Sequence, residues 1–113
     1  MPLISVTTNQ KVDKKTADNL KAACGTAITI LPGKTERWLM VEIEGEKSLY
    51  FAGTDEPCAI ASVEILGKAA PAVYETMTAA MCDILSAALN VPKDRVYVKY
   101  EEISTWGWNG TNF

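Results

Sequence analysis

The chain has 113 residues, 48% of them hydrophobic and 22% charged, and a formal net charge of −3, which is typical of one soluble globular domain covering residues 1–113. Its Lys and Arg residues are scattered, no run of about 18 apolar residues predicts a membrane helix, and the N-terminus lacks a secretory signal, so we expect a cytoplasmic protein without nucleic acid or membrane partners. Because the chain contains no histidine, a Cys/His zinc site and a Ser–His or Cys–His catalytic pair are excluded.

The first predicted strand covers residues 3–8, where Leu3, Ile4 and Val6 give a high β-propensity. Pro2 lies directly before it and has no amide hydrogen, so it fits only the first position of a strand or an edge strand. Removal of Met1, which is common when the second residue is small, leaves Pro2 with a free secondary amine on a rigid ring. From the residues alone, Pro2 is therefore either a simple strand start or a base.

A helix is predicted over residues 14–31, because apolar residues recur there at helical spacing. Asp13 is suited to cap its N-terminus, and Pro32–Gly33 is suited to end it. Cys24 falls on the apolar face, so we expect a core residue rather than a reactive thiol. The face consists of Leu20, Cys24, Ala27, Ile28 and Leu31.

The next segment predicts two strands joined by a turn. Residues 37–45 are rich in β-branched and aromatic residues, and residues 48–53 predict a second, short strand. Glu44–Lys47 resembles a hairpin turn between them. Cys58, which follows a proline in a predicted loop, is expected to be more accessible than the other cysteines. The first of these strands is apolar on both faces, with Leu39, Val41 and Ile43 on one and Trp38 and Met40 on the other.

The second half of the chain repeats the order strand, helix, strand, at residues 59–66, 71–90 and 95–103. Pro71 suits the first helical position, where its missing N–H is not needed, and Asn90 suits the end of the helix. Cys82 lies on the apolar face of this helix and is expected in the core. Residues 105–113 predict a small hairpin with its turn at Trp108–Gly110.

The two halves are similar to each other. The segments PGKTERWLMVEI (32–43) and PKDRVYVKYEEI (92–103) each follow a predicted helix, and LISV (3–6) matches IASV (60–63). This repetition predicts two βαβ units, at about residues 2–45 and 58–103, because parallel strands need a crossover helix. The predicted fold class is α/β in two layers, with a four-stranded mixed sheet and both helices on one face.

The other face of this predicted sheet has no cover. Trp38, Met40 and Tyr97 are expected on it, and such an apolar patch is unusual on a monomer. We therefore expect self-association, in which the short strands at 48–53 and 106–109 extend the sheets of neighbouring subunits.

Several motifs together match a known pattern along the whole chain. They are Pro2 behind Met1, Gly33–Lys34 after the first helix, DEPCAIASVEILGK (55–68), PKDRVYVKY (92–100) and Gly107–Asn109. On these residues, in this order and spacing, the chain resembles the macrophage migration inhibitory factor (MIF) family of the tautomerase superfamily. The resemblance implies two βαβ units per subunit and a homotrimer that closes the open sheet faces around a central channel.

The resemblance implies a cofactor-free keto–enol tautomerase that acts on 2-keto acids such as phenylpyruvate and on dopachrome-like substrates. The catalytic base of the family is the terminal proline amine, which is Pro2 here once Met1 is removed. Taking a proton from beside a carbonyl and returning it to oxygen suits a group whose pKa lies near the operating pH. A nearby cation and burial both lower the pKa of an amine, so one lysine close to Pro2 serves this purpose.

The resemblance also assigns substrate-binding residues at sites between subunits. Lys34 pairs with the substrate carboxylate; its alternative is a solvated cation near a helix C-terminus. Leu66 offers its backbone N–H to the substrate. Tyr97, presented by a neighbouring subunit, stacks on or hydrogen-bonds an aryl substrate; its alternative is to fill the interface. Four aromatic residues form an apolar rim; their alternative is ordinary sheet and interface packing. They are Trp38, Trp106, Trp108 and Phe113.

Three features depart from the mammalian cytokine of the family. Lys99 stands where that protein has an asparagine, and it is either a second carboxylate-binding cation or a solvated rim lysine. Trp106 replaces a smaller aliphatic residue, which predicts a narrower pocket. Cys58–Ala61 keeps only the first cysteine of a CxxC motif, so a dithiol oxidoreductase role is not expected.

Two other functions remain open from the sequence. The first is a MIF-like secreted cytokine, released without a signal peptide, that binds a protein receptor and has a vestigial tautomerase site. The second, reached without the family, is an α+β ligand-binding or regulatory module. Activity that depends on a free Pro2 amine separates the enzyme from both.

Overall fold

The structure is a computed structural model that describes all 113 residues. Its elements, in chain order, are β1 (Pro2–Thr8), α1 (Lys14–Ala27), β2 (Met40–Glu44), β3 (Ala59–Leu66), α2 (Pro71–Leu89), β4 (Val96–Ile103), β5 (Gly107–Trp108) and β6 (Thr111–Asn112). Short 3-10 helices occupy Ile28–Ile30, Glu36–Trp38 and Lys93–Arg95. Neither α-helix is both long enough and apolar enough to span a bilayer.

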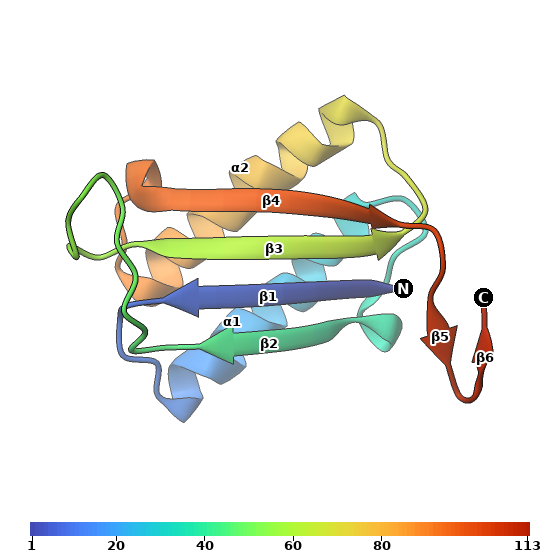
Figure 1. Cartoon of the computed structure of the whole chain (residues 1–113), viewed down its shortest axis with the longest axis horizontal. Helices are drawn as coiled ribbons and strands as arrows, with labels where there is room; N and C mark the ends of the chain where they lie inside the picture. The colour runs from blue at the N-terminus through green and yellow to red at the C-terminus, as the bar shows by residue number, and fades with distance from the viewer.

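The first four strands form one mixed sheet in the order β2-β1-β3-β4. Strands β1 and β2 are parallel, β3 and β4 are parallel, and β1 and β3 pair antiparallel in the centre. Each parallel pair is connected by one helix, and Figure 1 shows both helices behind the sheet. The predicted fold class, two βαβ units with both helices on one face, is confirmed.

The hydrophobic core lies between the two helices and the sheet. Along β1 and β3 every second residue is buried, because successive side chains of a strand point to opposite faces. Cys24 is in this core, where burial raises the pKa of its thiol to about 11, and Cys82 packs against it. The largest fully buried side chains include Ile4, Val6, Leu20, Val63, Met77 and Met81.

The helix ends follow the predicted capping with one difference. Asp13 accepts a hydrogen bond of 2.8 Å from the backbone N–H of Thr16, as expected of an N-cap. Asn90 adopts a left-handed conformation with φ 56° and ends α2. The first helix is shorter than predicted: it ends at Ala27, and Ile28–Ile30 continue as a 3-10 turn, because the β-branched run ITI disfavours the α conformation.

The strand predicted over residues 37–45 is wrong at its start. Glu36–Trp38 form a 3-10 helix, and β2 begins only at Met40. Trp38 therefore does not lie on the sheet, but contacts the ring of Trp108 edge-on at 5.0 Å. Beyond Met40, the exposed side of β2 carries Glu42 and Glu44, so the open face is more polar than predicted.

The short strand at 48–53 and the hairpin turn before it are also wrong. This segment is a loop with a single isolated bridge between Phe51 and Thr54, and its turn residues Ala52 and Gly53 have φ 53° and 80°. Its carbonyls bind the side chains of Asn9 and Arg95 rather than another strand. The predicted accessibility of Cys58 is wrong for the same reason, because the packed loop leaves this residue only 2% exposed.

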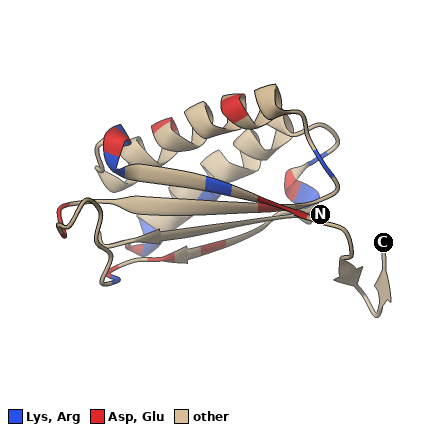
Figure 2. Cartoon of the chain, turned by 45° about the horizontal axis from the view of Figure 1, so that its top comes forward, with Lys and Arg blue, Asp and Glu red and all other residues tan.

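The predicted C-terminal hairpin is confirmed as β5–β6. Asn109 and Gly110 form its turn with φ 52° and 83°, and the N–H of Phe113 donates to the carbonyl of Trp106 over 3.0 Å. The hairpin lies beyond the end of the sheet at which β1 begins (Figure 1). It carries no Lys, Arg, Asp or Glu, as its uniform tan in Figure 2 shows.

Candidate active site

A cavity of about 330 Å³ opens at the N-terminal end of β1. This volume lies at the lower end of the range for small-molecule sites, and the lining is mostly apolar, as in such sites. Three parts of the chain enclose it, namely the start of β1, the turn before β2 and the segment leading into β5. The lining residues are Met1, Pro2, Leu3, Arg37, Trp38, Leu39, Met40, Trp106, Gly107 and Trp108.

Pro2 is held at this cavity by the pairing of β1 with β3. Pro2 is opposite Ile65 in the antiparallel register, and its residue is buried. The ladder continues one step further, because the N–H of Leu66 donates to the carbonyl oxygen of Met1 over 3.0 Å. A proline can occupy this place because the strand position needs no N–H from it.

Lys34 reaches the same point from the loop after α1. Its Nζ donates a hydrogen bond of 2.8 Å to the carbonyl oxygen of Leu66, and the side chain is half-buried. Gly33, with φ 78°, makes the turn that precedes it. Lys34 forms no ion pair with a carboxylate in the structure, so its charge acts on its surroundings without a local counter-charge.

This environment changes the protonation of the terminal amine of the chain. The pKa of the Met1 amine is lowered, first by burial and then by the nearby charge of Lys34. Both effects disfavour the protonated form. A terminal amine in this place is therefore neutral over a wider pH range than an exposed one, which is the state that a general base requires.

An aromatic cluster supports the other side of the cavity. The rings of Trp38 and Trp108 meet edge-on at 5.0 Å, Trp38 and Phe113 meet edge-on at 6.1 Å, and Trp108 stacks on Phe113 at 5.9 Å. Such pairs contribute about 0.5–1.5 kcal/mol each beyond the burial of their area. The C-terminal hairpin is thereby fixed against the turn that carries Trp38.

The structure brings together some of the predicted site residues. Pro2, Trp38 and Trp106 line the cavity, Phe113 packs against its wall, and Lys34 and the backbone of Leu66 meet beside Met1. Sequence reasoning missed Arg37, Leu39 and Met40 as lining residues, since they were assigned to a strand. The sequence contained one indication of this: Arg37 and Trp38 begin only three residues after Lys34, a predicted site residue.

Tyr97 and Lys99 are not near Pro2 in the same chain. Tyr97 is opposite Ile60 in the sheet, whereas Pro2 is opposite Ile65, a separation of about 17 Å along β3 at the usual rise per residue. The Tyr97 ring contacts Phe51 at 4.9 Å and the residue is 60% exposed. Lys99 lies 3.8 Å from a carboxylate oxygen of Glu101. A single chain therefore holds only part of the predicted site.

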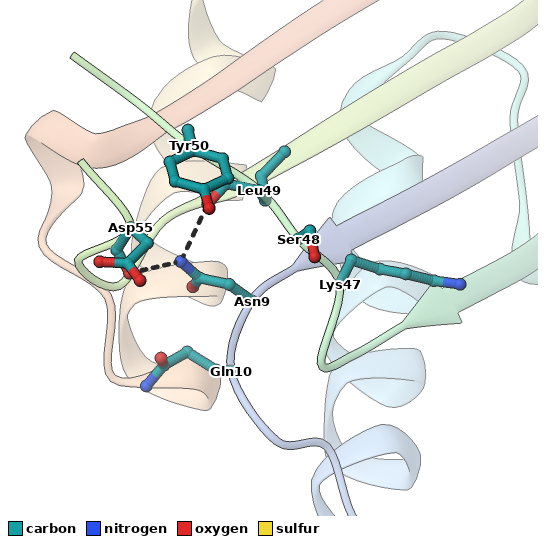
Figure 3. Close-up of a pocket in the computed structure, with 7 residues that line it drawn as sticks. All are labelled: Asn9, Gln10, Lys47, Ser48, Leu49, Tyr50 and Asp55. Atoms are coloured by element: carbon teal, nitrogen blue, oxygen red, sulfur yellow. Dashed lines mark hydrogen bonds between the residues drawn. The ribbon is translucent and has the colours of Figure 1, made fainter. Parts of the chain in front are cut away.

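A second hollow lies at the opposite end of β1 and has a different character. Figure 3 shows Asn9 pointing into the loop, where its Nδ2 donates to the carbonyls of Leu49 and Asp55 at 3.2 and 3.0 Å. Its Oδ1 accepts from the N–H of Cys58 at 3.0 Å. The amide is thus saturated by the protein, and Lys47 is paired with Glu44. We assign this hollow of about 240 Å³ to loop packing rather than to ligand binding.

Comparison with known proteins gives a consistent result over the whole chain. The family model "Macrophage migration inhibitory factor (MIF)" matches residues 1–113. Macrophage migration inhibitory factor of Xenopus laevis is 30% identical over 115 aligned residues, which cover 100% of this chain and 99% of that protein. The mouse protein of the same name is 32% identical over 72% of both chains.

Solved structures show the same similarity. The crystal structure of Leishmania major MIF2 superposes with a TM-score of 0.93 at 31% identity and covers 100% of this chain and 97% of that one. The macrophage migration inhibitory factor of Trichinella spiralis gives a TM-score of 0.83 at 26% identity, with 98% and 99% coverage.

Proposed function

The chain belongs to the macrophage migration inhibitory factor family, and from this membership and the cavity at Pro2 we propose that it is a cofactor-free keto–enol tautomerase. Family membership supports a tautomerase or cytokine-like function. The proposed substrates are aryl 2-keto acids of the phenylpyruvate type, and dopachrome-like compounds. The apolar, tryptophan-lined cavity suits an aryl group.

The proposed base is the amine of Pro2 after removal of Met1. In the chain with Met1, the Pro2 nitrogen belongs to an amide and cannot accept a proton. Once Met1 is absent, the nitrogen is a secondary amine at the buried first position of β1. Burial and the charge of Lys34 lower the pKa of the Met1 amine, and the same two causes act on an amine one residue further along the chain.

The observation that carries the proposal is the hydrogen bond from the Leu66 N–H to the Met1 carbonyl oxygen. This oxygen belongs to the acyl group on the Pro2 nitrogen. An oxygen atom beside Pro2 therefore accepts a hydrogen bond of 3.0 Å from the Leu66 N–H. Removal of Met1 frees this N–H. A substrate carbonyl oxygen that takes the place of the Met1 oxygen lies next to the base.

The proposed reaction moves one proton. The Pro2 amine takes a proton from the carbon beside the substrate carbonyl, and the electrons of the broken C–H bond form the enolate. The Leu66 N–H stabilises the negative charge that develops on the oxygen, with the charge of Lys34 close by. The protonated Pro2 then returns the proton to that oxygen and is regenerated as the base.

A homotrimer completes the proposed site. The open sheet face exposes Met40 at 70% and Tyr97 at 60%, which favours a covering partner. Within one chain Tyr97 and Lys99 lie far from Pro2, so we propose that a neighbouring subunit supplies them to the cavity. The oligomer thus joins the two groups of predicted site residues that a single chain keeps apart.

Enol formation from phenylpyruvate tests the proposed function. We expect the chain without Met1, with its mass verified, to catalyse formation of the enol. The reaction is followed by the ultraviolet absorbance of the enol. The Pro2→Gly variant keeps a free terminal amine but not the rigid secondary amine, and we expect it to lose most of the activity. Absence of catalysis by the correctly processed, folded protein contradicts the proposal.

Receptor binding is the second candidate, since the relatives are named for an effect on macrophage migration. The loop between β2 and β3, where Tyr50 is 68% exposed, offers a surface for a protein partner. Binding through this surface does not need a free amine. Acylation of Pro2 therefore abolishes the proposed catalysis and leaves receptor binding intact.

A further inference from the structure

Arg37 is the only charged side chain that lines the cavity at Pro2. No carboxylate in the structure forms an ion pair with it. The carboxylate of the neighbouring Glu36 lies instead against Gly25 of α1, at the place where a Cβ on that glycine would sit. A guanidinium without a counter-charge at the edge of an apolar cavity is available for an anionic ligand.

The position of Arg37 is supported by the aromatic cluster. Its guanidinium carbon lies 5.1 Å from the centre of the Trp38 ring, within the range of a cation–π interaction. Trp38 in turn contacts Trp108 and Phe113 of the C-terminal segment. An arginine in a cation–π contact can still donate two parallel hydrogen bonds to a carboxylate through its planar fork.

Lys34 has a different position. Its Nζ is bonded to the carbonyl of Leu66 at 2.8 Å, and it does not line the cavity. It does affect the terminal amine of the chain, whose pKa its charge lowers. The two cations thus have different places: Lys34 lies next to the amine, and Arg37 lies at the cavity wall.

We propose that Arg37 binds the carboxylate of the substrate, while Lys34, held at the Leu66 carbonyl, assists at the keto oxygen. This assignment rests on the proposed tautomerase function, and Arg37 is not among the site residues predicted from the sequence. The matching ligand is amphiphilic, with an aryl group among the tryptophans and a carboxylate at Arg37. A neutral aryl ketone lacks the second contact.

Equilibrium binding tests the proposal without relying on catalysis. All three tryptophans of the chain line this cavity, so ligand binding is measured by tryptophan fluorescence. The probes are 3-phenylpropanoate and its neutral amide, 3-phenylpropanamide, and neither can enolise as a 2-keto acid does. We expect Arg37→Gln to weaken binding of the acid about tenfold or more, as loss of a charged hydrogen-bonded contact predicts, and to leave the amide unchanged.

Two further variants make the result specific. Arg37→Lys keeps the charge but not the planar fork, and we expect partial recovery of acid binding. Lys21→Gln removes an exposed cation of α1 that is in no ion pair, and we expect no change. If Arg37→Gln weakens binding of the acid and of the amide equally, or weakens binding of neither, Arg37 does not bind the carboxylate and the proposal is overturned.

Kinetics separate this proposal from the proposed function. We expect Arg37→Gln to raise KM for phenylpyruvate without moving the pH profile of kcat, and Lys34→Gln to move the pH profile. If the wild-type protein is inactive but distinguishes acid from amide through Arg37, the tautomerase function fails and the anion-binding role stands. If the wild-type protein is active and Arg37→Gln leaves KM unchanged, the tautomerase function stands and the anion-binding role of Arg37 fails.

Discussion

The ammonium of Lys34 donates a hydrogen bond to the carbonyl oxygen of Leu66 over 2.8 Å. The N–H of the same Leu66 binds the Met1 carbonyl at 3.0 Å. The end of β3 therefore fixes the cation and the start of the chain relative to each other through one residue. In the chain that retains Met1, Leu66 therefore holds Lys34 and the residue before Pro2 close together.

The pH dependence of catalysis tests the role of Lys34. A positive charge near the Pro2 amine disfavours the protonated form and lowers its pKa. Lys34→Gln removes that charge, so the amine stays protonated to higher pH and less base is present at neutral pH. We expect the acidic limb of the kcat profile to move to higher pH, with several-fold lower activity at mildly acidic pH.

Lys34→Arg is the matched control for this experiment, because it keeps the charge. We expect its acidic limb to stay near that of the wild-type protein. An unchanged acidic limb in Lys34→Gln means that the lysine does not set the protonation state of the base.

Stability tests the assignment of Asn9 to loop packing. Its side chain donates to the carbonyls of Leu49, Asp55 and Glu56 and accepts from the N–H of Cys58. Asn9→Ala removes all of these bonds, and we expect a loss of about 2 kcal/mol in the free energy of unfolding measured by urea denaturation.

The same variant is expected to expose Cys58, which a thiol reagent then modifies faster. The matched control is Gln10→Ala, since the Gln10 side chain makes no hydrogen bond in the structure, and its effect is expected within about 0.5 kcal/mol. Equal destabilisation by both variants contradicts the assignment.

The contact between Tyr74 and Glu102 predicts an unusual tyrosine titration. The Tyr74 hydroxyl donates to the Glu102 carboxylate at 2.7 Å, and burial, this hydrogen bond and the carboxylate charge raise the pKa of Tyr74 to about 12. The neutral tyrosine therefore stabilises the fold fully below about pH 10, and this contribution is lost as the pH rises through about 12. Ultraviolet titration of the wild type, minus that of Tyr74→Phe, measures this pKa.

Glu102→Gln removes the negative charge from the same position, and we expect it to lower the pKa of Tyr74 towards the ordinary value near 10. A wild-type Tyr74 that already titrates near 10 contradicts the described contact.

The mass of the assembly tests the proposed trimer. We expect sedimentation equilibrium to give the mass of three 12.3 kDa chains. Tyr97→Glu places a charge on the exposed apolar part of the sheet and is expected to shift the population towards single chains, whereas Lys21→Glu on α1 does not. A wild-type protein that remains a single chain at micromolar concentration contradicts the trimer.

Sequence reasoning predicted the sheet and helices well, because their patterns are strongly periodic. The strand over 59–66 has the predicted limits, and α2 differs from its prediction only by Asn90, which caps it. The alternation of buried residues along β1 and β3 follows from the same pattern. The turn at Asn109–Gly110 was predictable because both residues tolerate a positive φ.

The errors lie where a distant side chain determines the local structure. The segment 48–53 has strand-like residues, but Asn9 and Arg95 bind its carbonyls from positions about 40 residues away in the chain. Likewise Arg37–Trp38 reads as a strand until the C-terminal aromatic residues are seen to pack on Trp38. Local propensity contains no information about such contacts.

The candidate site was predictable in part. Pro2 and Lys34 were recognised from a set of motifs rather than from periodicity, and the structure places both beside Leu66. Arg37 was missed, because its availability depends on Glu36 turning to Gly25 and on the Trp38 ring. These side-chain orientations come from tertiary contacts, which local sequence patterns do not predict.

A comparison of two forms of the same chain tests the central claim most directly. One form begins at Pro2 and the other retains Met1, with both masses verified, and the rate of phenylpyruvate enolisation is measured for each. The account predicts that retention of Met1 lowers kcat by roughly a hundredfold or more, as expected for loss of a general base. Equal rates for the two forms would show that the proton is carried by a group other than the amine of Pro2.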